Sequence, residues 1–532
     1  MASVTREIER KYEAPADTPA AGTPGRDGPP AADDTALLDA LTRTDGVDRV
    51  REQDTEELDA VYHDTDDGRL AATRTTLRRR TGGHDAGWHL KLPVTTADDA
   101  RDELHAPLAD TVPADLARLL RSRTRGAPLG PVLRLRTTRR RHTLHAADGT
   151  TLAEVAADTV RAERLDGAPG GLAGRATAWR EIEIELTEAA PADLLDRAEE
   201  HLTDAGIRRS HDRSKFARAL ADTGPPPETG PGPDPAPAPG TAGAEVLAHV
   251  ARWHRALVAL DTDVRRDLPD SVHQLRVAIR RLRGAFRTYR KVLDRAVTEP
   301  IGDELKWLAS QLAPARDGEV LTARLHHLLD TTDPALVLGP ASARLQLWST
   351  ARAAEARDRV HAALDSPRHL ALLTALARLA TDPPLREAAH RPARKVLPAA
   401  LARDHRRLAT RIDHALALPP GADRDHALHR ARKAAKRARY ATEAARPALG
   451  KPAKRYRKRV KTVQRLLGAH QDSVVTRDAL RQLGLQAHGA GESAFTWGLL
   501  YGTETARADA AERDLPEAWE AVRAQGPPGA GG

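Results

Sequence analysis

The sequence lacks cysteine and has very few aromatic residues, and both absences narrow what the chain can be. Its 532 residues contain no cysteine, which excludes disulfides, thiolate chemistry and cysteine-type zinc sites. Aromatic residues are only 3% of the chain, so its cores must depend on leucine, valine and alanine. No run of about 18 apolar residues could span a membrane, and the acidic, polar N-terminus has no signal-peptide pattern. A cytoplasmic location is expected.

Charged residues are abundant but unevenly distributed. They make up 30% of the chain with a net charge of +8, yet residues 273–295 and 429–465 are dominated by arginine and lysine. Local basic surfaces of this kind indicate a polyanionic partner. Nucleic acid and polyphosphate are both candidates, and the scarcity of aromatic side chains for base stacking counts against single-stranded nucleic acid.

Proline and glycine divide the chain, whose length suits two to four domains. A stretch that includes TGPPPETGPGPDPAPAPGTAG cannot pack a core and is predicted to be a linker. A similar insert at 14–34 is predicted to be a mobile loop. The predicted organisation is a first domain at 3–220, the linker at 221–244, a second domain at 245–515 and a flexible tail at 516–532.

The two predicted domains differ in periodicity. Before the linker, period-two segments such as GWHLKL, PVLRLRTTRRRHTL and WREIEIELT recur, which predicts an antiparallel sheet or barrel. After the linker, stretches rich in alanine, leucine and arginine follow a helical period. The fold class is therefore α+β and multidomain, with a β-rich domain followed by an all-α domain.

Several predicted strands carry charge on one face and aliphatic residues on the other. Carboxylates alternate in EIERK and WREIEIELT, whereas TTLRRR and GWHLKL carry basic residues. One such strand alone is typical of a solvated sheet. Their recurrence predicts a closed sheet with a charged lumen and an apolar outside covered by helices. A charged lumen needs compensation, which an anionic ligand and a divalent metal would provide.

These segments resemble the CYTH superfamily, the triphosphate tunnel metalloenzymes. EIERK matches the ExExK signature, and VYHDTDDGRL, LRRRTGGHDAGWHLKLP, RDEL, LAEVAAD, WREIEIELT and SHDRSKFARAL follow in order over residues 3–220. The resemblance implies an eight-stranded antiparallel tunnel with flanking helices. It also implies Mg²⁺ or Mn²⁺ as cofactor and hydrolysis of inorganic triphosphate or a related short polyphosphate, as an acid anhydride hydrolase.

The resemblance also implies roles for individual residues. The metal ligands would be Glu7, Glu9, Glu183 and Glu185. The catalytic cations at the phosphates would be Lys11, Arg78, Arg80, Lys91 and Lys215. Further phosphate-binding residues would be Arg101, Arg139 and Arg141, the last two being alternatives for one position. Other acidic tunnel residues would be Glu103, Glu154 and Asp158, again with the last two as alternatives. Phosphoryl transfer to water mainly needs positioning and charge neutralisation, and this inventory suits both.

The second domain contains an internal duplication. His273, Arg276, Arg280 and Arg283 are spaced by 3, 4 and 3 residues, and the same steps separate His429, Arg432, Lys436 and Arg439. Such spacing places each set on one face of a helix. An aspartate, Asp317 or Asp472, follows each leading histidine after 44 or 43 residues. Because like charges on one helix face repel, an external anion would stabilise both stripes.

These stripes resemble the CHAD domain, the conserved histidine α-helical domain, over residues 245–515. The resemblance implies a helical bundle of two related halves whose basic centre binds inorganic polyphosphate. The predicted polyphosphate-binding residues are His273, Arg276, Arg280, Arg283, His429, Arg432, Lys433, Lys436, Arg437, Arg439, Lys454 and Lys458. Association with polyphosphate granules would follow from such binding.

Other functions remain open from the sequence alone. The tunnel could act on organic triphosphates or as an adenylate cyclase, since its family includes both. Both domains could instead bind polyphosphate without catalysis. Nucleic acid is the less favoured ligand of the helical domain, and the sequence does not determine the oligomeric state.

Overall fold

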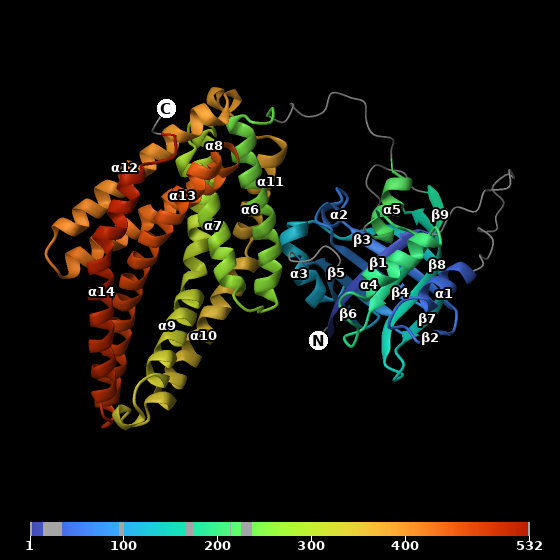
Figure 1. Ribbon diagram of the computed structural model, residues 1–532, viewed down its shortest axis with the longest axis horizontal. Coiled ribbons are helices and arrows are strands. Elements are labelled where there is room, and N and C mark those ends of the chain that lie inside the picture. Colours follow the sequence, from blue (N-terminus) through green and yellow to red (C-terminus); the bar gives the residue numbers. More distant parts are fainter. Residues whose placement is uncertain are drawn as a thin grey trace. The chain divides into compact units, whose positions relative to one another are not determined.

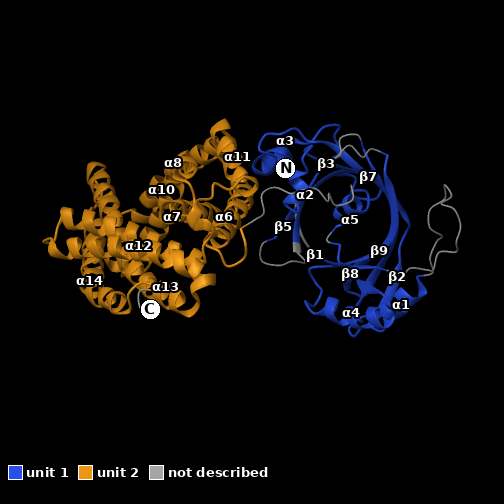
Figure 2. Cartoon of the chain, turned by 90° about the horizontal axis from the view of Figure 1, so that it is seen from above, with its two compact units in different colours: residues 1–230 blue, residues 231–532 orange. Residues whose placement is uncertain are grey.

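The computed structural model describes residues 3–13, 34–94, 100–165, 174–212, 214–224 and 237–529, without the side chains of residues 3, 4, 6, 7 and 100. The chain forms two compact units, Met1–Gly230 and Pro231–Gly532 (Figure 2). The loop predicted at 14–34 lies outside the described residues except for Asp34, and so does the middle of the predicted linker. The predicted domain limits therefore stay predictions.

The first unit is built on an antiparallel sheet (Figure 1). Its described strands are β1 (Ser3–Glu13), β2 (Arg49–Glu52), β3 (Glu56–Asp64), β4 (Thr76–Thr81), β5 (Gly87–Pro93), β6 (Ala100–Ala106), β7 (Gly130–His145), β8 (Thr151–Arg164), β9 (Ala176–Leu186) and β10 (Arg208–Arg209). Its described helices are α1 (Thr35–Thr42), α2 (Arg69–Ala72), α3 (Ala114–Thr124), α4 (Leu194–Asp204) and α5 (Lys215–Asp222).

The described residues form ten strands, not the eight that the sequence resemblance implied. The order is β10-β1-β6-β5-β4-β3-β7-β8-β9, and β2 pairs with β7. The additional strands are short: β2 adds to the end of β7, and the two-residue β10 adds to β1. Strand β1 has two long partners, since residues 3–8 pair with β6 and residues 9–12 pair with β9.

The two faces of the sheet differ in chemistry, as the period-two pattern predicts. Aliphatic residues of β4, β5 and β6, such as Leu77, Leu90 and Leu104, pack against α2 and α3. On the other side of the unit, Ile182 and Ile184 of β9 belong to a core that α1 and α4 cover. The charged residues of the same strands therefore point to the opposite face.

Helix α5 packs against part of that opposite face. Its first turn is capped by Ser214, whose hydroxyl accepts a hydrogen bond of 3.1 Å from the amide of Ala217. Phe216 stacks on Tyr62 of β3 with ring centroids 5.0 Å apart, and both residues belong to one buried cluster. This packing fixes the neighbouring residue Lys215, which is 8% exposed, among the charged side chains.

The second unit is helical. Its described α-helices are α6 (Ala242–Arg265), α7 (Ser271–Thr288), α8 (Arg295–Gln311), α9 (Ala313–Asp330), α10 (Ala341–Asp365), α11 (Pro367–Thr381), α12 (Ala393–Ala417), α13 (Ala422–Gly489) and α14 (Phe495–Gln525). None of the helices in the described residues combines the length and hydropathy that a membrane crossing needs. The unit is thus an all-α fold, as predicted.

Two features of the C-terminal helices matter for the site. Helix α13 contains a kink at Gly450, whose backbone is not helical, and prolines at 447 and 452 flank it.

Helix α14 continues to Gln525 and passes the limit predicted at residue 515. The tail prediction is wrong for residues 516–525, because Trp519 and Val522 are buried in a core with α12 and α13.

Candidate functional site

Three carboxylates gather on the charged face of β8 and β9. One oxygen each of Asp158, Glu181 and Glu183 lies within 4.8 Å of the others. Lys215, the first residue of α5, places its Nζ 2.9 Å from Asp158 and 2.7 Å from each of the two glutamates. Lys11 of β1 contacts Glu183 from the neighbouring strand. We call these three carboxylates the acidic triad.

Arg139 of β7 completes the surroundings of the acidic triad. Its Nε and Nη2 donate hydrogen bonds of 2.8 and 2.7 Å to the two oxygens of Asp158, and Nη2 also lies 3.0 Å from Glu183. Burial alone would raise the pKa of Asp158, but Arg139 and Lys215 outweigh it and bring that pKa well below its usual range. The sequence left open the choice between Arg139 and Arg141 and the choice between Glu154 and Asp158. Arg139 and Asp158 are the ones that lie in this group.

Asp158→Asn is expected to reduce the free energy of unfolding by about 3–5 kcal/mol at neutral pH, because the buried Lys215 and the partly buried Arg139 lose their charged partner. Urea denaturation of the variant and the wild type measures this. The folded-state pKa is depressed, so the contribution is complete above the unfolded value of about 3.9 and is lost as the pH falls below it. A difference between the two proteins that stays constant down to pH 3 would contradict this assignment.

A second group of carboxylates lies one step further along the same strands. Glu9 of β1 pairs across the sheet with Glu185 of β9, and Glu185 pairs with Glu154 of β8. Burial and the neighbouring Glu9, Glu103 and Glu154 raise the pKa of Glu185, although Lys91 opposes them. We call Glu9 and Glu185 the open carboxylate pair, since negative charge accumulates around Glu185.

The open carboxylate pair fits a divalent metal. Carboxylate oxygens are the ligands that Mg²⁺ and Mn²⁺ prefer, and a cation would favour the charged form of Glu185, whose pKa is raised by burial and by the neighbouring glutamates. Glu7 precedes Glu9 by two residues on β1, opposite Arg101 in the strand register, but its side chain lies outside the described part of the structure. Glu183, the remaining predicted ligand, is instead part of the acidic triad.

Cations on β4 and β5 face a third acidic position, Glu103 of β6. Arg78 Nη2 lies 3.6 Å and Lys91 Nζ 3.9 Å from its carboxylate. His89 Nδ1 lies 2.9 Å from the same carboxylate. Arg78 also donates a hydrogen bond of 3.4 Å to the hydroxyl of Tyr62. These predicted phosphate-binding residues thus lie on the same charged face as the carboxylates.

The other predicted cations occupy different surroundings. Arg80 contacts Asp85, and burial, together with Arg78 and Arg139, lowers its pKa to about 9. Arg141 bridges Glu56 at 3.2 Å and the half-exposed Glu154 at 2.9 Å. Arg101 is 8% exposed on β6.

Sequence reasoning assigned no role to four residues of this face: Glu181, Tyr62, His89 and Glu56. Glu181 shares strand parity with Glu183 and Glu185 in WREIEIELT, and that signal could have found it. Tyr62, His89 and Glu56 contact charged residues of other strands. The alternation of side chains along one strand does not show such contacts between strands.

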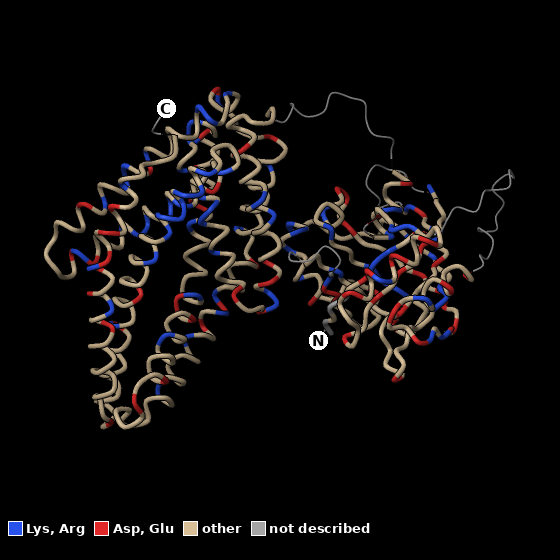
Figure 3. The backbone as a smooth tube through the Cα atoms, viewed as in Figure 1, with Lys and Arg blue, Asp and Glu red and all other residues tan. Residues whose placement is uncertain are grey.

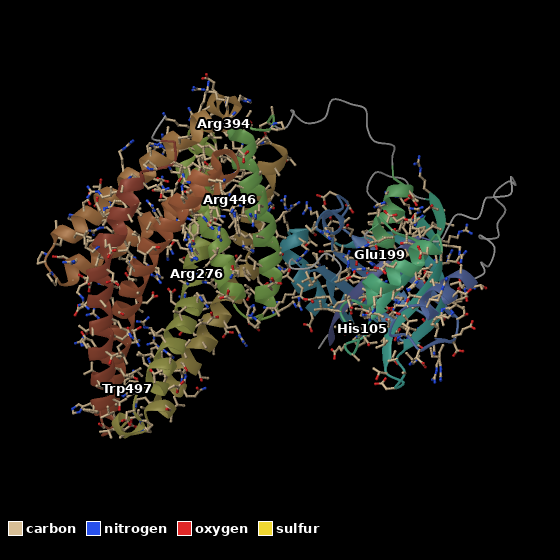
Figure 4. The ribbon with its side chains drawn as sticks, viewed as in Figure 1. His105, Glu199, Arg276, Arg394, Arg446 and Trp497 are labelled. Carbon is tan, nitrogen blue, oxygen red and sulfur yellow. The ribbon has the colours of Figure 1, made fainter. Side chains whose placement is uncertain are left out.

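The second unit holds a basic pocket of about 900 Å³ between the two stripe-bearing helices. Figure 3 shows lysine and arginine gathered along α7 and the first part of α13, and Arg276 is labelled in Figure 4. The predicted residues that line the pocket are His273, Arg276, Arg280, Arg283, His429, Arg432, Lys433, Lys436 and Arg437. We call this cavity the basic pocket.

The duplication in the sequence corresponds to paired contacts in the basic pocket. Arg276 of α7 lies 2.8 Å from Asp317 of α9, and Arg432 lies 3.4 Å from Asp472 within α13. These are the only two carboxylate residues among the described residues that line the pocket. Burial, then Arg432 and Arg280, lower the pKa of Lys436 to about 7. The pocket therefore carries a large excess of positive charge.

Three predicted residues, Arg439, Lys454 and Lys458, do not line the basic pocket. The guanidinium of Arg439 stacks on Tyr440 at 4.7 Å from the ring centroid. Lys454 and Lys458 follow the kink at Gly450 and are exposed. Sequence reasoning missed the pocket residues of the intervening helices, namely Lys306, Arg316 and Arg324. These cations stand in no basic stripe, so the sequence offered no signal for them.

Comparisons with known protein families identify one domain before the linker and one after it. The CYTH domain model matches residues 35–220 and the CHAD domain model matches residues 248–481. The CYTH match begins after β1 and so does not include Glu7 or Glu9. Two Mycobacterium tuberculosis relatives, the uncharacterized proteins MT2285 and Rv2226, are each 38% identical over 505 residues, covering 90% of this chain and 91% of their own length.

Solved structures with similarity to parts of the chain include PptA from Streptomyces chartreusis, which is 22% identical with a TM-score of 0.43 over 53% of this chain and 99% of its own. The CHAD domain from the plant Ricinus communis is 26% identical with a TM-score of 0.42 over 56% of this chain and 96% of its own. With a CYTH domain followed by a CHAD domain, the chain belongs to both of these domain families.

Proposed function

We propose that the first unit is a metal-dependent triphosphatase and that the second unit binds inorganic polyphosphate. The observation that carries the first part is the distribution of charge on one face of one sheet. Carboxylates of β6 and β9 lie close to cations of β5 and β7, and these side chains are partly buried. A linear triphosphate with a divalent metal would compensate both sets at once.

The same proposal includes a tunnel. Strand β1 pairs with β6 through residues 3–8 and with β9 through residues 9–12, which links the two ends of the strand order. In Figure 2 the strands of the first unit follow a curved path around a common axis. The charged face is then the inner face, and helices cover the apolar outer face.

The roles of the residues follow from their positions. A divalent cation held by Glu9 and Glu185, with Glu7, would supply Lewis-acid stabilisation of the phosphate oxygens. Arg78 and Lys91 bind non-bridging oxygens and neutralise the charge that develops on them. Water attacks the terminal phosphorus, the bond to the bridging oxygen breaks and diphosphate leaves. A carboxylate of the inner face orients the water and takes its proton.

Phosphate release from a panel of substrates tests the proposal. The panel comprises inorganic triphosphate, ATP, thiamine triphosphate and long-chain polyphosphate, each with Mg²⁺, with Mn²⁺ and with a chelator. We expect metal-dependent release of phosphate that is fastest from inorganic triphosphate. Conversion of ATP to cyclic AMP and diphosphate would assign a cyclase instead. No turnover of any substrate would favour the second candidate function, a protein that binds polyphosphate with both units.

The basic pocket carries the second part of the proposal. Its stripes come from two helices with the same spacing, and the two carboxylates that line it contact only some of its cations. A flexible polyanion can enter a cavity of about 900 Å³, whereas a stiff nucleic acid duplex is too wide for it. Polyphosphate should therefore bind without added metal, because arginine and lysine supply the countercharge directly.

Binding of long-chain polyphosphate at pH 8 is expected to take up nearly one proton per chain of protein. Lys436 has a pKa of about 7 in the empty pocket and is mostly neutral at pH 8, and a bound polyanion raises that pKa toward its ordinary value. Calorimetric titrations in buffers of different ionisation enthalpy measure the uptake. At pH 6 Lys436 is already charged and adds nothing, so any uptake there comes from other groups such as His273 and His429, which line the same pocket with lowered pKa values. At pH 8 the uptake by Lys436→Arg should be lower than that of the wild type by nearly one proton. Equal uptake by the wild type and Lys436→Arg would contradict this role.

A further inference from the structure

The acidic triad already contains a cation that belongs to the chain. An ammonium group has three N–H donors, and Lys215 Nζ lies 2.7–2.9 Å from one oxygen of each of the three carboxylates. The oxygens of Asp158, Glu181 and Glu183 also lie close enough together to hold a metal ion. Lys215 therefore occupies the place in which such an ion would otherwise sit.

The charges of this group balance without a metal. The three carboxylates carry three negative charges, and Lys215, Lys11 and Arg139 supply three positive charges in direct contact with them. These cations outweigh burial and lower the pKa values of Asp158 and Glu181. A divalent cation added here would bring two uncompensated charges into a site where Asp158 and Glu181 are 2% and 4% exposed.

The open carboxylate pair differs in this respect. Lys11 is 3.6 Å from Glu9, beyond the distance of a strong hydrogen bond, and it contacts Glu183 more closely. Burial, together with the neighbouring Glu9, Glu103 and Glu154, raises the pKa of Glu185 against the opposing effect of Lys91. Lys215 thus contacts all three carboxylates of the acidic triad directly, whereas Lys11, Lys91, Lys215 and Arg101 together hold the pKa of Glu9 well below its usual range.

We propose that Lys215 is a tethered cation that replaces a second metal ion, so that the tunnel holds one divalent ion, at the open carboxylate pair. Lys215 then holds the three carboxylates together with its three N–H donors, and no metal concentration is needed to fill that position. The inference rests on the proposed triphosphate site, but it makes a statement about ion binding that can be measured without any substrate turnover.

The test counts Mn²⁺ ions bound to the full chain, by isothermal titration calorimetry and by electron paramagnetic resonance. Lys215→Met removes the ammonium and keeps an unbranched apolar stem, so the acidic triad should accept an ion. We expect Lys215→Met to bind one more Mn²⁺ per chain than the wild type. The charge-retaining variant Lys215→Arg should bind the same number as the wild type, and Lys215→Met combined with Glu181→Gln should lose the additional ion.

A separate variant keeps the inference testable if Lys215→Met does not fold. Glu181→Gln in an otherwise wild-type chain should leave the number of bound Mn²⁺ ions unchanged, since Lys215 already fills the triad. Loss of one ion in Glu181→Gln, or no additional ion in a folded Lys215→Met, would overturn the inference. If these counts come out as expected while the wild type hydrolyses nothing, the proposed function fails and the tethered cation stands.

Discussion

Glu9→Gln is expected to lower kcat/KM for triphosphate hydrolysis by about 100- to 1,000-fold while the fold remains intact. The amide keeps the shape of the side chain and removes the charge that would hold the metal. Glu9 lies opposite Glu185 in the strand register, and its loss would leave Glu185 as the main described ligand of the open carboxylate pair. Phosphate release at several Mn²⁺ concentrations, together with Mn²⁺ titration calorimetry, measures the effect.

The matched control is Glu52→Gln, which removes the same charge from an exposed position on β2. It should leave both hydrolysis and Mn²⁺ binding unchanged. Near-wild-type turnover in Glu9→Gln would remove the metal site from β1 and with it the proposed triphosphatase mechanism. A decrease in turnover that excess Mn²⁺ restores would show that the residue acts through metal affinity.

The double variant Arg280→Gln/Lys436→Gln is expected to weaken binding of long-chain polyphosphate by at least about 100-fold, since each charge-assisted hydrogen bond contributes about 1.5–3 kcal/mol. Both residues line the basic pocket, one from each half of the duplication. The dependence of log affinity on log salt concentration should also become shallower, by about 0.7 for each cation removed. Fluorescence titrations at several salt concentrations measure both quantities.

Lys454→Gln/Lys458→Gln provides the control with the same change in net charge. These lysines are exposed and do not line the basic pocket, so affinity and salt dependence should change little. Equal weakening by the two double variants would mean that polyphosphate responds to overall charge and not to the pocket. Competition by duplex DNA at equal phosphate concentration would have the same meaning.

Much of the first unit could be predicted because a strand has a strict period of two. Parity alone places Glu9 with Lys11, and Glu183 with Glu185, on the charged face. Parity does not give the register between strands. The register decides that Asp158 lies opposite Glu181 and that Glu154 lies opposite Glu185, and so it separates the acidic triad from the open carboxylate pair.

The second unit shows the same limit for helices. The repeated spacing of His273 and Arg276 with His429 and Arg432 predicted two stripes, and both line the basic pocket. Lys306 and Arg324 reach the pocket from α8 and α9, which no local pattern indicates. Lys454, which follows the kink at Gly450, does not line the basic pocket, so its role in binding stays a prediction.

The double pairing of β1 has a consequence for how the first unit folds. The strand leaves the ribosome well before its partners β6 and β9, which end at residues 106 and 186. These pairings have a large sequence separation, and such contacts form slowly because a long loop must close first. Residues 3–8 of β1 can pair once β6 has been synthesised, whereas residues 9–12 stay without their partner until most of the unit has been synthesised. Because Glu9 and Lys11 lie on the part of β1 that pairs with β9, the site would be completed in the last step of folding.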